Sequence, residues 1–464
     1  MGSLEVKRSW LRNQLANLGG REAVLLLAAR AAMSAQRALV AVLVPIYLAQ
    51  LGFSGAELGG LFTAVGLVSA ALSFGIGFAA DRIGRKPFVV YVPLLSACAA
   101  ALFAFTSSTP ILFIAAALGA FGRGAGAGAA QVGPYQPAEQ ALLAGLVKDS
   151  QRPRLFSAVA SASSLGSLIG AALATTPLGE KAAGQIGPAT YRPAFLAAAA
   201  LPVLAAALAA FVREQPPPAR REAIRRRRQA ARSRRASTPL SPFSRWLARR
   251  LAITNLTNGV AVGLFGPFIS YWLYRRFGAD APTIGLIYLV GNGLTVLTNL
   301  TAAPLAARLG TVRTVVFARF TQAALLIPLA LSPTLAVAAT IFCIRLIVQR
   351  VGLALRQSFV MGEAPAAERA RVAALSQLPS QGAAALSPTL AGYLFDAVSL
   401  SVPFILAGAF QLANAALFQL YFGGGRAARR KALFAQRERA QLAAATPAPN
   451  GTSRPQARLR RPEA

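Results

Sequence analysis

Long apolar runs separated by short polar segments recur along the whole chain. Each run is close to the roughly 20 residues that a helix needs to cross a hydrocarbon core of about 30 Å. The pattern predicts an all-α membrane protein with both termini on one side, because the number of runs is even. Twelve runs are counted, at 31–50, 57–80, 88–106, 110–131, 155–176, 193–212, 251–273, 282–304, 314–332, 335–356, 372–396 and 402–422.

Basic residues gather in the segments on one side of these runs. The chain has 48 Lys and Arg against 15 Asp and Glu, a formal charge of +33. Such a charge is also typical of nucleic-acid-binding proteins. Here the basic residues instead mark one side of the membrane, because only Lys181, Arg192, Arg275 and Arg276 fall in segments on the other side. By the positive-inside tendency we expect a multi-pass protein of the cytoplasmic (inner) cell membrane, with both termini cytoplasmic and no nucleic acid partner.

A basic linker divides the chain into two halves of six runs each. It contains a proline triplet and the run Arg225–Arg228, so we expect it to be disordered or to lie on anionic lipid headgroups, with Trp246 and Leu247 as interfacial anchors. The predicted division is a cytoplasmic N-terminal tail 1–22, an N-terminal six-helix half 23–212, the linker 213–250, a C-terminal six-helix half 251–422 and a basic, largely disordered tail 423–464 that also contacts headgroups.

A dense charged turn stands between the second and third runs. Residues four apart share one side of a helix end, as Gly77 and Asp81 do, and Gly84 permits a tight reversal. We interpret the turn as a conformational gating loop of Gly77, Asp81, Arg82, Gly84, Arg85 and Lys86.

This turn resembles the signature G-x-x-x-D-R-x-G-R-K of the major facilitator superfamily at every defined position. The second half keeps only Arg308 and Gly310 of an equivalent turn. The resemblance implies twelve transmembrane helices in two pseudo-symmetric six-helix halves that rock about a site at the membrane midplane.

A glycine pair in the fifth run is similar to the antiporter motif G-x-x-x-G-P of the same superfamily. Gly166 and Gly170 match it, but Ala171 stands where proline is expected. We interpret the pair first as a helix-packing face, which leaves export only weakly supported.

The ionisable residues inside the runs are arginines, and such residues by default mark a transport pathway. Arg345 lies about 15 Å from the start of its run, near the midplane, and Gln349 shares its face. Arg319 and Arg356 lie closer to the ends, where snorkelling explains them. For Arg37 function and snorkelling are equally open. The resemblance implies that the first, fourth, seventh and tenth helices line the cavity, so Arg37, Arg123 and Arg345 are cavity candidates, together with Gln349 on the face of Arg345. Asn255, Asn258 and Asn292 of the seventh and eighth runs are added as neutral polar groups that could either orient a substrate or bond across helices.

Little else in the chain points to chemistry. There is no histidine, and the two cysteines, Cys98 and Cys343, lie far apart within runs. We therefore expect no enzyme, metal or cofactor. All the acids, including Glu57, Asp81 and Glu139, fall at run ends or in loops, so no buried carboxylate is expected and the coupling ion, proton or sodium, stays open.

These features together predict a secondary active transporter that moves a small molecule by alternating access. An arginine-lined cavity without buried acid favours an anionic substrate. Two alternatives stay open: a drug or metabolite efflux antiporter, and a non-transporting membrane scaffold or sensor that recruits partners through its basic segments.

Overall fold

The protein is helical throughout the part that the computed structural model describes. That part comprises residues 20–121, 133–147, 151–176, 188–213, 240–298, 310–365 and 368–445. Within it, every regular element is an α-helix or a short 3-10 turn. The predicted all-α class is confirmed.

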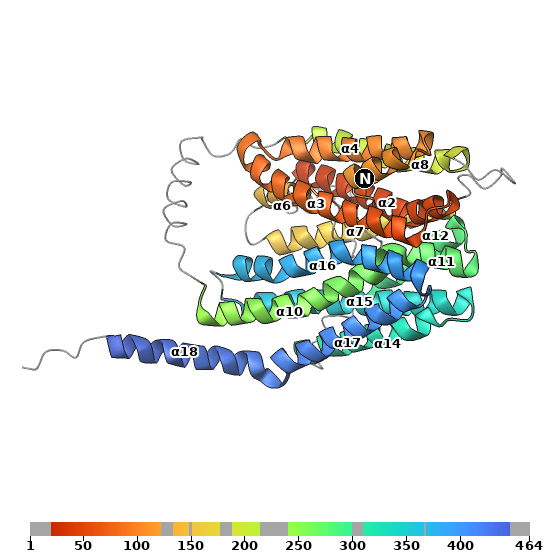
Figure 1. Cartoon of the computed structure of the whole chain (residues 1–464). Helices are drawn as coiled ribbons and strands as arrows, with labels where there is room; N and C mark the ends of the chain where they lie inside the picture. Colours follow the sequence, from red (N-terminus) through yellow and green to blue (C-terminus); the bar gives the residue numbers. More distant parts are fainter. Residues whose placement is uncertain are drawn as a thin grey trace, which may run out of the picture.

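The first half of the chain packs as one bundle, shown in red to yellow in Figure 1. Helices α5 and α6 both pack on α3 and α4, and together they take the place of the fourth pass. The helices are α2 (Gly20–Gln50), α3 (Gly55–Ile83), α4 (Lys86–Phe105), α5 (Thr109–Gly119), α6 (Gln136–Gly145), α7 (Arg152–Thr175) and α8 (Pro188–Ala210).

The second half forms a similar bundle beside the first, shown in green to blue (Figure 1). A 3-10 turn at Gly266–Phe268 joins α10 to α11 within one pass. Helix α18 follows the last pass and extends beyond the bundle (Figure 1). The helices are α10 (Pro242–Phe265), α11 (Ile269–Phe277), α12 (Ala281–Thr298), α14 (Thr311–Ala330), α15 (Leu335–Glu363), α16 (Arg369–Ala397), α17 (Val402–Phe422) and α18 (Arg426–Ala445).

The two bundles together make twelve passes in two six-helix halves. Nine spans within the described residues are long and apolar enough by themselves to cross a membrane. The other three passes are the divided one of α5 and α6, α12 next to the undescribed residues 299–309, and α16.

Several predicted boundaries are corrected by the structure. Helix α2 begins at Gly20, inside the predicted tail, and α6 occupies residues predicted as a loop. The fourth run does not form the single helix expected, because α5 ends at Gly119, where Ala120 takes a left-handed conformation (φ 57°). The terminal tail opens with a 20-residue helix, α18. Residues 214–239 and 446–464 lie outside the described residues, so their lipid contacts stay a prediction.

The expected interfacial anchors of the linker also differ from the structure. Helix α10 begins at Pro242, so Trp246 and Leu247 belong to the second bundle. Leu247 is fully buried in an apolar cluster at that end, and Trp246 packs on Phe243 with ring centroids 5.9 Å apart. Both residues contribute to packing at this end of the bundle, and an interfacial role of the half-buried Trp246 stays a prediction.

The bundle has two distinct ends. The end of the bundle that contains Gly84, Pro242, Gly310 and Arg426 is called the basic end. The end where α3 begins at Gly55 is called the opposite end. The halves are packed tightly in the half of the bundle next to the opposite end. There the α3 and α16 backbones meet at Gly59 and Gly392, and α7 meets α12 at Gly285.

The same helix faces separate toward the basic end. On α3 the face that packs at Gly59 and Gly66 continues to Phe74, which is 71% exposed, and to Gly77, next to which a Cβ would meet open space. On α16 the corresponding face continues from Ala385 to Leu378, which is 61% exposed. Since residues three and four apart share a face, the halves are closed at the opposite end and parted at the basic end.

Candidate functional site

The predicted gating loop connects α3 to α4 at the basic end. Gly84 ends α3 with φ +98°, which confirms the tight reversal, and Gly310 repeats it in the second half with φ +82°. The Arg85 guanidinium donates to the carbonyl oxygen of Ala141 at 2.8 Å, so the loop is tied to α6. The side chain of Arg82 is exposed. Of the loop's remaining members, Gly77 and Asp81 lie within α3, and Lys86 begins α4 ahead of Pro87.

Arg345 of α15 is a buried residue of the predicted site. It is 4% exposed, and its guanidinium carbon lies 3.9 Å from the centroid of the Phe265 ring at the end of α10. The buried Tyr288 of α12 lies within electrostatic reach. Arg345 Nε and Nη1 have no hydrogen-bond acceptor among the described residues. A buried cation with free donors is held here by three different helices.

Two further arginines of the second half are buried nearby, where snorkelling was expected. Arg319 of α14 donates to the amide oxygen of Asn258, and Arg356 of α15 donates to that of Asn255. Both guanidinium groups are almost fully buried, and the Nε of each lacks an acceptor in the described part of the chain. Asn255 in turn donates to the carbonyl oxygen of Ser376 at 2.6 Å. The predicted candidates Asn255 and Asn258 are therefore arginine partners.

The other predicted cavity residues are placed as follows. Asn292 is buried on α12, and Gln349 is half-buried on α15, one turn from Arg345. Arg37 is half-buried on α2, and its charge acts on Tyr135 of the same half. Arg123 lies outside the described residues. Of the second-half candidates, the structure thus places Asn255 and Asn258 on α10 and Arg345 against its end at Phe265.

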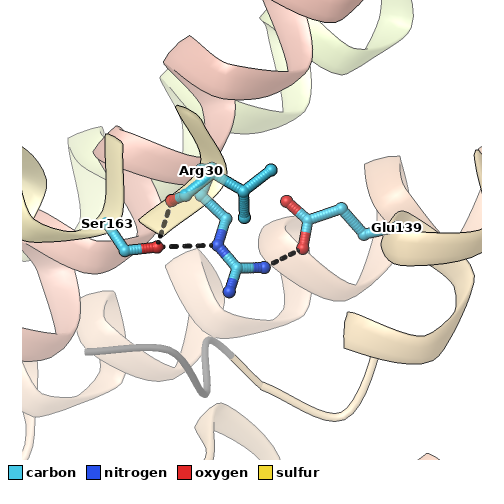
Figure 2. A network of polar contacts seen from close by, with 4 residues as sticks. Arg30, Glu139 and Ser163 are labelled. Atoms are coloured by element: carbon cyan, nitrogen blue, oxygen red, sulfur yellow. Dashed lines mark hydrogen bonds and ion pairs between the residues drawn. The ribbon is translucent and has the colours of Figure 1, made fainter. Parts of the chain in front are cut away.

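The first half contains a buried ion pair that the sequence did not predict. Figure 2 shows Arg30 of α2 between Ser163 of α7 and Glu139 of α6. Arg30 Nη1 forms a salt bridge with Glu139, and its Nε donates to Ser163 Oγ at 2.9 Å. Arg30 is 1% exposed and Glu139 is 2% exposed. The expectation that no carboxylate is buried is wrong, because α6 brings Glu139 into the bundle from a predicted loop.

The glycine pair of the fifth pass has a packing role. A Cβ on Gly166 or Gly170 would overlap the carbonyl oxygens of Ala31 and Ala35 on α2. The close approach of α2 and α7 depends on these two glycines, as the packing interpretation predicted.

The fold and the site define a class of protein. Two six-pass halves, closed together at one end and parted at the other around buried polar groups, are the architecture of a multi-pass membrane transporter. The chain belongs to the Major Facilitator Superfamily, whose family model matches residues 26–252 and 251–455. This confirms the resemblance of the charged loop, and the protein is a transporter rather than an enzyme.

Solved structures of transporters share the fold. The structure of the D-xylose-proton symporter is similar with a TM-score of 0.66 and 14% identity over 85% of this chain and 96% of that one. The structure of the nucleoside transporter NupG is similar with a TM-score of 0.62 and 12% identity, over 86% of this chain and 99% of that one. The structure of a bacterial homolog of the human lysosomal transporter Spinster, in an inward-facing and occupied conformation, has a TM-score of 0.63 and 15% identity, over 88% of this chain and 96% of that one. No curated protein matches the chain in sequence.

Proposed function

We propose that this protein is a secondary active transporter of a small organic anion. The observation that carries the proposal is Arg345, a guanidinium buried near the membrane midplane with two donor nitrogens that meet no described acceptor. A charged group at the centre of a bilayer costs at least about 2.5–3.5 kcal/mol. An anion that binds Arg345 offsets this cost, since Arg presents a planar fork of donors to carboxylate or phosphate.

The surroundings of Arg345 support an organic rather than a simple inorganic anion. The Phe265 ring lies against one face of the guanidinium, and the Tyr288 side chain belongs to the same buried cluster. Ligand sites combine such apolar walls with a few polar groups that fix orientation. An apolar or aromatic body that carries an acidic group fits these walls.

The direction of opening follows from the charges at the ends. We assign the basic end to the cytoplasm by the positive-inside tendency, with both termini there, and the membrane to the inner cell membrane. The arrangement described above is then closed to the outside and open to the cytoplasm. Alternating access requires that the contacts at the opposite end break while the basic end closes.

The coupling ion that the structure favours is the proton. Glu139 is a carboxylate buried against a single arginine, and a proton that neutralises it releases Arg30 from the ion pair. Sodium would need several oxygen ligands around the carboxylate, whereas Glu139 faces the guanidinium donor of Arg30. The nearby Ser163 hydroxyl accepts from Arg30 and donates to the carbonyl oxygen of Val159. Import and export both remain compatible with this coupling.

The test is anion uptake by proteoliposomes with imposed proton or sodium gradients. We expect the Arg345→Leu variant to lose uptake by about 30-fold or more, because the lost charge partner costs about 2–5 kcal/mol. Arg345→Lys should retain part of the activity. The matched control is Arg192→Leu, which removes an arginine that packs on Phe105 at 4.7 Å, far along the chain from the site. Unchanged uptake by correctly inserted Arg345→Leu protein would remove the proposal.

The same measurements separate the alternatives. Efflux of uncharged drugs predicts resistance on overexpression and no effect of Arg345→Leu. A scaffold predicts that deletion of residues 220–235 abolishes function, whereas a transporter keeps its flux.

A further inference from the structure

The two halves differ in whether a carboxylate balances their buried arginines. In the first half the carboxylate of Glu139 balances Arg30. In the second half Arg319, Arg345 and Arg356 are each less than one-tenth exposed, and no carboxylate of the described residues forms a salt bridge with any of them. Three buried cations therefore lie in one half without a counter-charge in the described structure.

These arginines follow one stretch of α10. Arg356 contacts it at Asn255, Arg319 at Asn258, and Arg345 at Phe265. At 1.5 Å per residue the three levels are about 4.5 and 10.5 Å apart. The charges of Arg345 and Arg356 both act on Arg319, so the three guanidinium groups form one electrostatic cluster. We call it the arginine ladder.

The neutral partners Asn255 and Asn258 do not accept from all the hydrogen-bond donors of the arginine ladder. Asn255 and Asn258 each accept from one guanidinium nitrogen, while the Nε of Arg319, Arg345 and Arg356 has no acceptor in the described structure. An amide oxygen satisfies a donor but leaves the charge uncompensated, and a buried uncompensated charge is among the most destabilising features of a fold. These buried donor atoms, which have no acceptor among the described residues, indicate that an anion binds beside them.

We infer that the arginine ladder binds an anion with more than one negative charge, one group at Arg345 and another at Arg319 and Arg356. This inference rests on the proposed function and narrows its substrate class to organic anions with two separate acidic groups, such as dicarboxylates or carboxylates that also carry a phosphate. A single charge would neutralise only one of three cations, whereas two charges match the extent of the ladder along α10.

The experiment is thermal unfolding of the full-length protein in detergent, titrated with succinate, inorganic phosphate, acetate or chloride at constant ionic strength. A ligand that binds the native state raises the unfolding temperature in proportion to its saturation. We expect the wild-type protein to bind succinate at least tenfold more tightly than phosphate, acetate or chloride. The comparison of succinate with phosphate separates two acidic groups set apart from two charges on one group.

The variants locate the two charges. Arg319→Gln and Arg356→Gln keep a hydrogen-bonding side chain, and we expect each to lose most of the preference for divalent anions while acetate still binds. Arg350→Gln is the matched control, since Arg350 is on α15 but turned about 140° from Arg345. If one ladder variant unfolds without ligand, the other still tests the inference.

Each result has a distinct meaning. Equal binding of acetate and succinate by the wild type, or full divalent preference in both glutamine variants, overturns the ladder inference and leaves the proposed function standing. Anion binding unchanged in Arg345→Leu overturns the proposed function itself. Absence of a shift with every anion overturns both.

Discussion

The carboxylate of Asp396, in the last turn of α16, caps the first turn of α3 in the other half of the protein at Gly55. Asp396 Oδ1 accepts from the backbone N–H of Gly55 at 2.9 Å, and Oδ2 accepts from that of Ala56 at 2.7 Å. A carboxylate at a helix N-terminus interacts favourably with the helix dipole and with N–H groups that have no partner in the helix. This contact joins the halves only while the opposite end is closed.

Removal of that charge should open the opposite end. Asp396→Asn retains one acceptor but loses about 1 kcal/mol of charge–dipole interaction, a change of about fivefold in the conformational equilibrium. The reporter is Thr63→Cys, because the Thr63 and Thr389 hydroxyls hydrogen-bond at 2.7 Å between the halves. In a background without Cys98 and Cys343, labelling of the reporter by an impermeant thiol reagent at the opposite end should accelerate about fivefold.

The matched control for Asp396 is Glu57→Gln. Glu57 also lies in the first turn of α3, where its carboxylate accepts from the Ser54 N–H at 2.9 Å, and that contact stays within the first half. Its loss should leave the labelling rate unchanged. Equal labelling in the Asp396 and Glu57 variants would show that the cap between the halves does not control opening.

Glycine substitutions should separate closure of the halves from folding. A Cβ on Gly392 would overlap the carbonyl oxygen of Gly55 across the halves, whereas one on Gly170 would overlap Ala35 within the first half. We expect Gly392→Ala to favour opening with little loss of unfolding temperature. We expect Gly170→Ala to destabilise the first half by about 1–3 kcal/mol through overpacking.

Thermal unfolding and the Thr63→Cys labelling rate together check this prediction. Gly60→Ala is the control on α3, because a Cβ there meets nothing within 4 Å. If both overlapping variants lower the unfolding temperature equally and neither changes labelling, the distinction between the two interfaces is wrong.

Glu368 at the basic end should make stability depend on pH. It lies between α15 and α16, where its carboxylate accepts from Ser241 N at 2.9 Å and Ser241 Oγ at 2.7 Å. Partial burial acts to raise the pKa of Glu368, but the nearby Ser244 side chain and the hydrogen bonds from Ser241 outweigh it and hold the pKa below its ordinary value. The contact ties the start of α10 to the loop before α16.

The direction of the pH dependence follows from the lowered pKa of Glu368. The carboxylate is favoured in the folded state, so its contribution is fully present above the unfolded pKa of about 4.3 and is lost as the pH falls through the lower folded value. We expect Glu368→Gln to unfold at a lower temperature than the wild type at pH 7. The difference should shrink toward zero under acid conditions. A difference that stays constant with pH would mean that ionisation of Glu368 plays no part.

Much of the fold was predictable because lipid imposes a simple rule on sequence. Each apolar run must form a helix, so the twelve passes and the two halves follow from run length alone. The Gly84 turn was predictable from local chemistry, since a residue without Cβ favours its positive φ. The break at Ala120 was not, because a non-glycine residue in the left-handed region has no local sequence signal.

The site was harder to predict because burial of a polar residue depends on its neighbours in space. Depth along the helix indicated that Arg345 is buried, as it is in the structure, but the same rule assigned the buried Arg319 and Arg356 to snorkelling. Their amide partners Asn258 and Asn255 lie on another helix, about 60 and 100 positions away in the chain. For Glu139 the available signal was a short amphipathic pattern after a proline, which predicts the start of a helix.

The Arg30–Glu139 pair should stabilise the protein only as a pair. Glu139→Leu or Arg30→Leu leaves one buried group without its counter-charge, and we expect each to destabilise the protein by about 3–5 kcal/mol. The double variant Arg30→Leu with Glu139→Leu removes both charges and should recover most of that loss. Thermal unfolding of the four proteins measures this coupling. If Glu139 also carries the coupling proton, the double variant will be stable yet unable to use a proton gradient for uptake. A stable double variant with full gradient-driven uptake would leave the pair a structural role alone, and additive losses would show that the two residues do not interact.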